Sequence, residues 1–248
     1  MKNRIIFLTV LFLMLLALTP VLAKDQVRPD VLDERGPLTK ITFIHYKKGF
    51  AKPPWAGGGS GSSDQCYSFL AKGAKWKTVE DFVINPTNSY GLPTDFIENS
   101  VLTGTNQWDT ESLHDVFGSA DVDSNASYDD SNTDEVNTLS FGSYPNNNVI
   151  AVTNVWGYFY GSPQTRELVE WDMLLNTSSS WSWGDAAADS SVMDVENITA
   201  HELGHAAGLG HPASTCTQET MYAYSEVGEI IKRDIYDGDI LGIRSLYQ

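Results

Sequence analysis

The sequence has few basic residues and many acidic ones. Its 248 residues include 16 Lys and Arg against 32 Asp and Glu, a formal net charge of -16 at pH 7. Such a chain repels phosphate groups, so we exclude nucleic acid and anionic membrane surfaces as partners. Hydrophobic residues make up 42% of the chain, which excludes a disordered protein and is enough for one substantial core.

Long hydrophobic runs are missing after the first residues of the chain. Lys2 and Arg4 precede an apolar run over residues 5–18, and Ala23 ends the segment. This order is typical of a signal peptide, so we expect residues 1–23 to be removed and the protein to be secreted. The alternative is an uncleaved membrane anchor, because the run is nearly long enough to span a bilayer. No later apolar run is long enough to span a bilayer, so no membrane association is expected after cleavage of the signal peptide.

Only two cysteines are present, Cys66 and Cys216. A signal peptide leads to an oxidising compartment, where one disulfide between them is the expected state. Their spacing alone does not prove the bond, and two free thiols remain the alternative.

Residues 24–63 are expected to form a separate segment. Residues 41–46 are rich in β-branched and aromatic side chains and predict a short strand. Gly57–Ser63 has the composition of a flexible linker, which is also a favourable place for proteolysis. The segment is therefore either a removable pro-segment or a permanent extension, and residues 64–248 form the main domain.

The main domain is predicted to have an α+β fold. A strand over residues 76–85, stopped by Pro86, comes first, and a helix capped by Thr94 or Asp95 follows. Another helix starts after Asp194, and the last one has a buried stripe of Ile240, Ile243 and Leu246. Strands are expected between the first two helices, over residues 116–120, 138–144, 149–160 and 167–176.

The most informative segment is His201-Glu-Leu-Gly-His-Ala-Ala-Gly-Leu-Gly-His211. On a helix, His201 and His205 lie on one face and can bind one metal ion, with Glu202 beside them as a general base. Gly208 is suited to the left-handed turn that ends a helix, after which His211 returns as the third ligand. Three protein ligands leave an open position, which is typical of a catalytic zinc site.

This HExxHxxGxxH pattern resembles the signature of the metzincin zinc metallopeptidases, which have a methionine turn downstream. Met221, in Thr220-Met-Tyr, resembles the methionine of that turn. The closest resemblance is to the matrixins, because the C-terminal helix around residues 239–247 is similar to theirs. Ala223 stands where other metzincins have a tyrosine ligand, so no such ligand is expected.

The resemblance implies a twisted mixed sheet, an active-site helix and a C-terminal helix, in a monomer that cleaves proteins or peptides. Zinc would acidify a water molecule and polarise the peptide carbonyl, while Glu202 would transfer the proton to the leaving amine. An extended substrate would pair with an edge strand, for which residues 169–175 are our candidate. The matrixin cysteine switch is not present. His45 and His114 are too few for a second zinc, and we expect both to be ordinary histidines.

A candidate calcium loop lies in the first half of the main domain. Asp121, Asp123, Asn125, Ser127 and Asp129 alternate as in an EF-hand, although the glycine and the final glutamate of that motif are absent. A solvated acidic loop is the alternative.

The sequence thus predicts a secreted zinc endopeptidase with a single catalytic zinc ion. Two alternatives remain: a zinc-binding module without catalysis, and a peptidase of narrow specificity. Retention of Glu202 argues against the first, because a structural zinc site needs no base.

Overall fold

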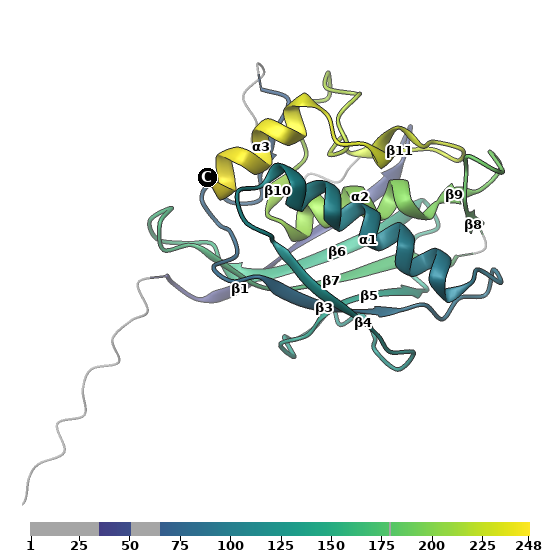
Figure 1. Cartoon of the computed structure of the whole chain (residues 1–248), viewed down its shortest axis with the longest axis horizontal. Helices are drawn as coiled ribbons and strands as arrows, with labels where there is room; N and C mark the ends of the chain where they lie inside the picture. Colours follow the sequence, from purple (N-terminus) through teal and green to yellow (C-terminus); the bar gives the residue numbers. More distant parts are fainter. Residues whose placement is uncertain (1–34, 51–64, 179) are drawn as a thin grey trace, which may run out of the picture. The chain divides into compact units, whose positions relative to one another are not determined.

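A computed structural model describes residues 35–50, 65–178 and 180–248, so the expected signal peptide and linker lie outside the described residues (Figure 1). The helices are α1 (Thr94–Glu111), α2 (Val195–Ala206) and α3 (Asp237–Tyr247), with a 3-10 turn η1 (Ile231–Arg233). The strands are β1 (Leu38–Lys47), β2 (Ser68–Phe69), β3 (Glu80–Asn85), β4 (Phe117–Val122), β5 (Asn137–Gly142), β6 (Val149–Tyr158), β7 (Glu167–Asn176), β8 (Trp183–Gly184), β9 (Met193–Asp194), β10 (Leu209–Gly210) and β11 (Tyr224–Ser225).

The fold is α+β, as the sequence predicted. Seven strands form one mixed sheet in the order β11-β1-β6-β7-β5-β3-β4, and α1 and α2 lie over one of its faces (Figure 1). The core between these layers contains Phe82 and Trp171 from the sheet and Val101 and Trp108 from α1. No helix in the described ranges is long and apolar enough to cross a membrane.

Close packing of α1 on α2 explains the glycine inside α1. A Cβ at Gly104 would lie 2.9 Å from Leu203 Cδ1 and 3.3 Å from Ala200 Cα. The indole nitrogen of Trp108 donates a hydrogen bond to the Ala200 carbonyl at 2.9 Å. These contacts hold the zinc-motif helix α2 against α1.

The N-terminal segment is more closely integrated than we expected from the sequence. The strand predicted at residues 41–46 exists, but it is the centre of β1, which pairs antiparallel with β6 and parallel with β11. Residues 38–47 are therefore not a piece separate from the main domain. The linker composition before Cys66 indicated a domain boundary. The position of the strand is determined instead by its pairing with β6, which is far away in the sequence.

The candidate substrate strand at residues 169–175 was assigned wrongly. These residues belong to β7, which is an interior strand between β6 and β5. Both of its edges are already hydrogen-bonded, so it cannot accept an added strand.

Two buried carboxylates on β7 lie on the sheet face away from α2. Glu170 and Asp172 are 0% and 1% exposed, and they accept hydrogen bonds from backbone amides of the loop at residues 129–135. Burial raises the pKa of Asp172 to about 8, and the charge of Glu170 adds to this effect. The hydrogen bond from the Asp129 amide acts in the opposite direction.

This shift predicts a pH dependence of stability. Between the ordinary pKa of 3.8 and about 8, folded Asp172 keeps a proton that the unfolded chain has lost. The free energy of unfolding should therefore fall as the pH rises through this window, and Asp172→Asn should remove on the order of 5 kcal/mol of that fall. Urea unfolding at pH 4 to 8 measures it. Asp121→Asn, at an exposed position of β4, is the control, and an equal slope in both variants would contradict the prediction.

Candidate metal centre and active site

The helix that carries the metal motif starts as its sequence predicts. The Asp194 carboxylate accepts a hydrogen bond from the Asn197 amide at 2.8 Å and so caps the N-terminus of α2. Arg233 also donates to Asp194, at 2.8 Å from its Nε. At the other end, Gly208 has a φ of +100° and turns the chain into β10. This turn is what returns His211 to the helix.

Three imidazoles meet at one point. His211 Nε2 lies 3.1 Å from His205 Nε2 and 3.3 Å from His201 Nε2. Three nitrogens bound tetrahedrally to zinc at its usual bond length lie about 3.4 Å apart, so the observed spacing fits that ion. The three side chains form a potential metal-binding group, and all are buried.

In two of these imidazoles, a hydrogen bond from Nδ1 determines the tautomer of the ring. His201 Nδ1 donates to the Thr220 carbonyl at 2.5 Å, and His205 Nδ1 donates to the Leu209 carbonyl at 2.9 Å. Each Nε2 therefore carries the lone pair that a metal needs. Burial also lowers the pKa of His201 well below its usual value, which keeps the ring neutral.

Glu202 lies fully buried beside the histidines. Its Oε2 accepts a hydrogen bond from Thr153 Oγ1 at 2.6 Å, and its Oε1 is 3.0 Å from His45 Nδ1. Burial raises the pKa of Glu202 to about 7, and the Thr153 hydrogen bond opposes the shift. A carboxylate with this pKa can both accept and return a proton near neutral pH.

His45 is not the ordinary histidine that we expected. It is 1% exposed, and its ring centroid lies 4.0 Å from that of His201. Together with His201 and Glu202 it forms a second potential metal-binding group that overlaps the first. No local pattern in the sequence indicates this contact, because 157 positions separate His45 from Glu202. His114, in contrast, is exposed.

Met221 lies beneath α2. A Cβ at Gly204 would come within 2.2 Å of the Met221 sulfur, so glycine at this position gives the methionine its space. Asp239 at the start of α3 accepts hydrogen bonds from the Thr220 and Met221 amides, at 2.6 and 3.2 Å. Helix α3 therefore positions the turn whose Thr220 carbonyl orients His201.

A disulfide joins Cys66 and Cys216, whose Cα atoms are 5.4 Å apart. It links the segment before β2 to the loop between His211 and Met221. Gly238 packs directly against Cys66, since a Cβ on Gly238 would lie 2.2 Å from the Cys66 carbonyl oxygen.

The candidate calcium ligands do not converge on one point. Asp121 lies in β4, and the carboxylates of Asp123 and Asp129 accept hydrogen bonds from amides of their own loop. Within the described residues, the potential metal-binding groups of His, Cys, Asp and Glu are the two that contain His201. Calcium binding by Asn125 and its neighbours stays a prediction.

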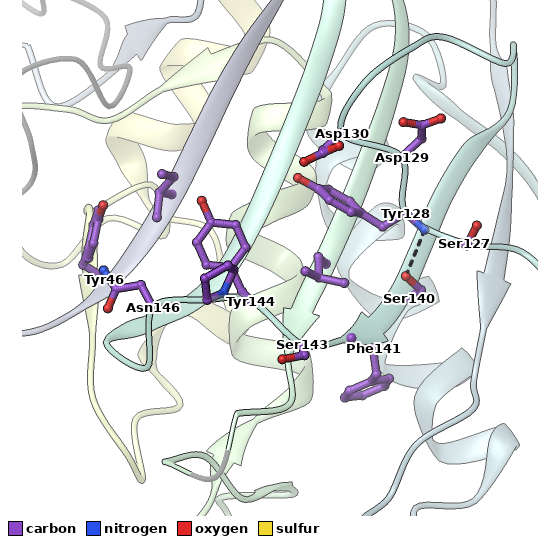
Figure 2. A pocket seen from close by; sticks show the side chains of 14 residues that line it. Tyr46, Ser127, Tyr128, Asp129, Asp130, Ser140, Phe141, Ser143, Tyr144 and Asn146 are labelled. Carbon is purple, nitrogen blue, oxygen red and sulfur yellow. Dashed lines mark hydrogen bonds between the residues drawn. The ribbon is translucent and has the colours of Figure 1, made fainter.

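A pocket of about 950 Å³ lies away from this centre (Figure 2). Tyr46, Tyr128 and Tyr144 contribute to its walls, but none of the three metal-binding histidines does. Ile44 and Tyr46 line the pocket and pack in a hydrophobic cluster separate from that of Phe43, whose ring stacks on His205. The pocket is thus on the opposite side of the sheet from Glu202.

Comparison with known proteins agrees with this geometry. A search of curated proteins finds no match. The family model for the matrixin peptidases, however, matches residues 107–248, which is more than half of the chain. The matched region contains His201, His205 and His211, whose arrangement suits the zinc site of this family. The chain therefore belongs to the matrixin family of zinc metallopeptidases.

Proposed function

We propose that this chain is a secreted zinc endopeptidase in which Glu202 is the general base. The observation that carries the proposal is the convergence of three buried imidazole nitrogens next to a buried carboxylate. A zinc ion bound by His201, His205 and His211 would supply a Lewis acid that polarises a peptide carbonyl and acidifies water.

The residues around the metal have separate tasks in this proposal. Glu202 takes a proton from the attacking water and passes it to the departing amine. Thr153 orients the carboxylate through its hydrogen bond to Oε2. Met221 and Asp239 act through His201, because they determine the position of the Thr220 carbonyl.

Secretion is supported by two independent features. The Cys66–Cys216 disulfide is typical of proteins from an oxidising compartment. Residues 1–23 have the order of charges and apolar residues that a signal peptide needs.

Zinc analysis combined with peptide cleavage tests the function. The purified protein should contain about one zinc ion, and it should cut unfolded casein and an internally quenched peptide blocked at both ends. A chelator should abolish cleavage, and added zinc should restore it. The assay is run on the intact chain and after cleavage within residues 51–64.

The blocked peptide also distinguishes cleavage within a chain from cleavage at its ends. Cleavage of only free-ended peptides would indicate an exopeptidase. A protein that holds zinc yet cuts nothing after release of the N-terminal segment would be a zinc-binding module.

A further inference from the structure

The strand β1 lies at the end of the sheet beside the metal centre, between β6 and the two-residue strand β11. It pairs with β6 from Leu38↔Tyr158 to Tyr46↔Val149, and with β11 at Tyr46↔Tyr224. On its other side β6 pairs with β7, so without β1 the amides and carbonyls of β6 would form a free edge. A free edge of this kind accepts an extended peptide as an added strand.

Two side chains of β1 point at the metal-binding residues. The Phe43 ring stacks on His205, with centroids 3.7 Å apart and an angle of 11° between the planes. His45 lies against His201 and places Nδ1 3.0 Å from Glu202 Oε1. Phe43 also meets His211 edge-on at 5.9 Å. Every residue of the metal centre is therefore covered by β1.

This arrangement leaves the general base no room to act. Thr153 engages one oxygen of Glu202 and His45 engages the other. His201, Glu202 and His205 are at most 1% exposed, so a substrate cannot reach them while β1 is present.

We propose that β1 is an intramolecular inhibitor that occupies the place of the substrate strand, and that it must leave before a protein can be cleaved. The proposal rests on the proposed peptidase function. It differs from inhibition by a cysteine, because both cysteines of the chain are in the disulfide.

The covalent connections of the chain allow β1 to leave. The disulfide begins at Cys66, after β1, so one cut within residues 51–64 would detach the strand from the rest of the chain. The ends of the strand region are tied by ion pairs, Arg35 to Glu167 at 2.7 Å and Lys48 to Glu226 at 3.0 Å. The region matched by the matrixin model includes β6 and β11 but not β1.

The test uses the full chain with a recognition site for a specific protease inserted between Ser60 and Gly61. Before the cut, cleavage of the end-blocked peptide should be on the order of 100-fold slower than after it, because tethering keeps β1 at a high effective concentration. Native mass spectrometry should show loss of the N-terminal fragment. Hydrogen exchange of the β6 amides should then become faster, whether or not the protein cleaves peptides.

A synthetic peptide of residues 35–50 supplies the matched comparison. It should inhibit the cut protein and restore slow exchange in β6, whereas peptides with Phe43→Ala or His45→Ala should inhibit at least about 10-fold less well. The Leu38→Ala peptide is the control, because Leu38 is the first residue of β1 and is 40% exposed.

Each outcome of these experiments either supports or overturns the inhibitor proposal. Measurable cleavage at equal rates before and after the cut would overturn the proposal. Unfolding of the protein once β1 has left would also overturn it, since β1 would then be an integral strand. If β1 leaves, the peptide rebinds and zinc is retained, but no substrate is cut, the inhibitor proposal stands and the peptidase function fails.

Discussion

Replacing Glu202 by glutamine is expected to lower the rate of peptide cleavage by about 1,000-fold while the protein keeps about one zinc ion. Glutamine has nearly the same shape, and its amide oxygen can still accept the hydrogen bond from Thr153. It cannot accept the proton of the attacking water. The measurement is kcat for the end-blocked peptide after release of β1, with zinc content determined on the same samples.

Glu196→Gln is the control for this experiment. Glu196 lies in the first turn of the same helix and is only partly buried, and its nearest charged partner is Arg233 at 3.8 Å. The substitution changes the same chemical group without touching the metal centre, so activity should stay within about 3-fold of the unchanged protein. If Glu202→Gln kept a tenth of the activity with zinc bound, another group would have to be the base.

Removing the disulfide is expected to have a large effect on stability. The bond closes a loop with a sequence separation of 150, which the chain-entropy model values at about 5 kcal/mol. We expect the double variant Cys66→Ser and Cys216→Ser to lose about 3–5 kcal/mol of unfolding free energy. Urea denaturation with and without a thiol reductant measures this loss.

The reductant serves as the internal control. It should destabilise the unchanged protein by a similar amount and leave the double variant unaffected. The loss should also weaken zinc binding, because Cys216 lies in the loop that joins His211 to Met221. A change below about 1 kcal/mol would mean that packing around Gly238 and Cys66 already holds these segments together.

The sequence predicted the regular elements well where the signal was local. Asp194 caps α2 because its carboxylate needs only an amide three residues away. The expected cap of α1 by Thr94 or Asp95 was wrong: the helix already begins at Thr94, and its cap position is Pro93 without a side-chain hydrogen bond. Helix ends depend on single backbone angles, which propensities describe poorly.

The chemistry of the metal centre also follows from local spacing along the chain. Two histidines four residues apart face the same way on any helix, and a glycine with positive φ reverses the chain within a few residues. His201, His205, His211 and Glu202 therefore come together through local geometry, and for this reason the amino-acid pattern is enough to indicate their role.

What the sequence alone determined is thus the helix that carries the ligands, the turn at Gly208 and the α+β class. Only the tertiary structure decided that β1 lies beside β6, that β7 is interior and that His45 meets Glu202. Strand neighbours are chosen by backbone hydrogen bonds between distant segments, and those bonds have the same chemistry in every strand. The residue pattern of one strand therefore does not predict which strand it pairs with. The residue spacing along one helix, in contrast, is enough to predict which side chains share a face.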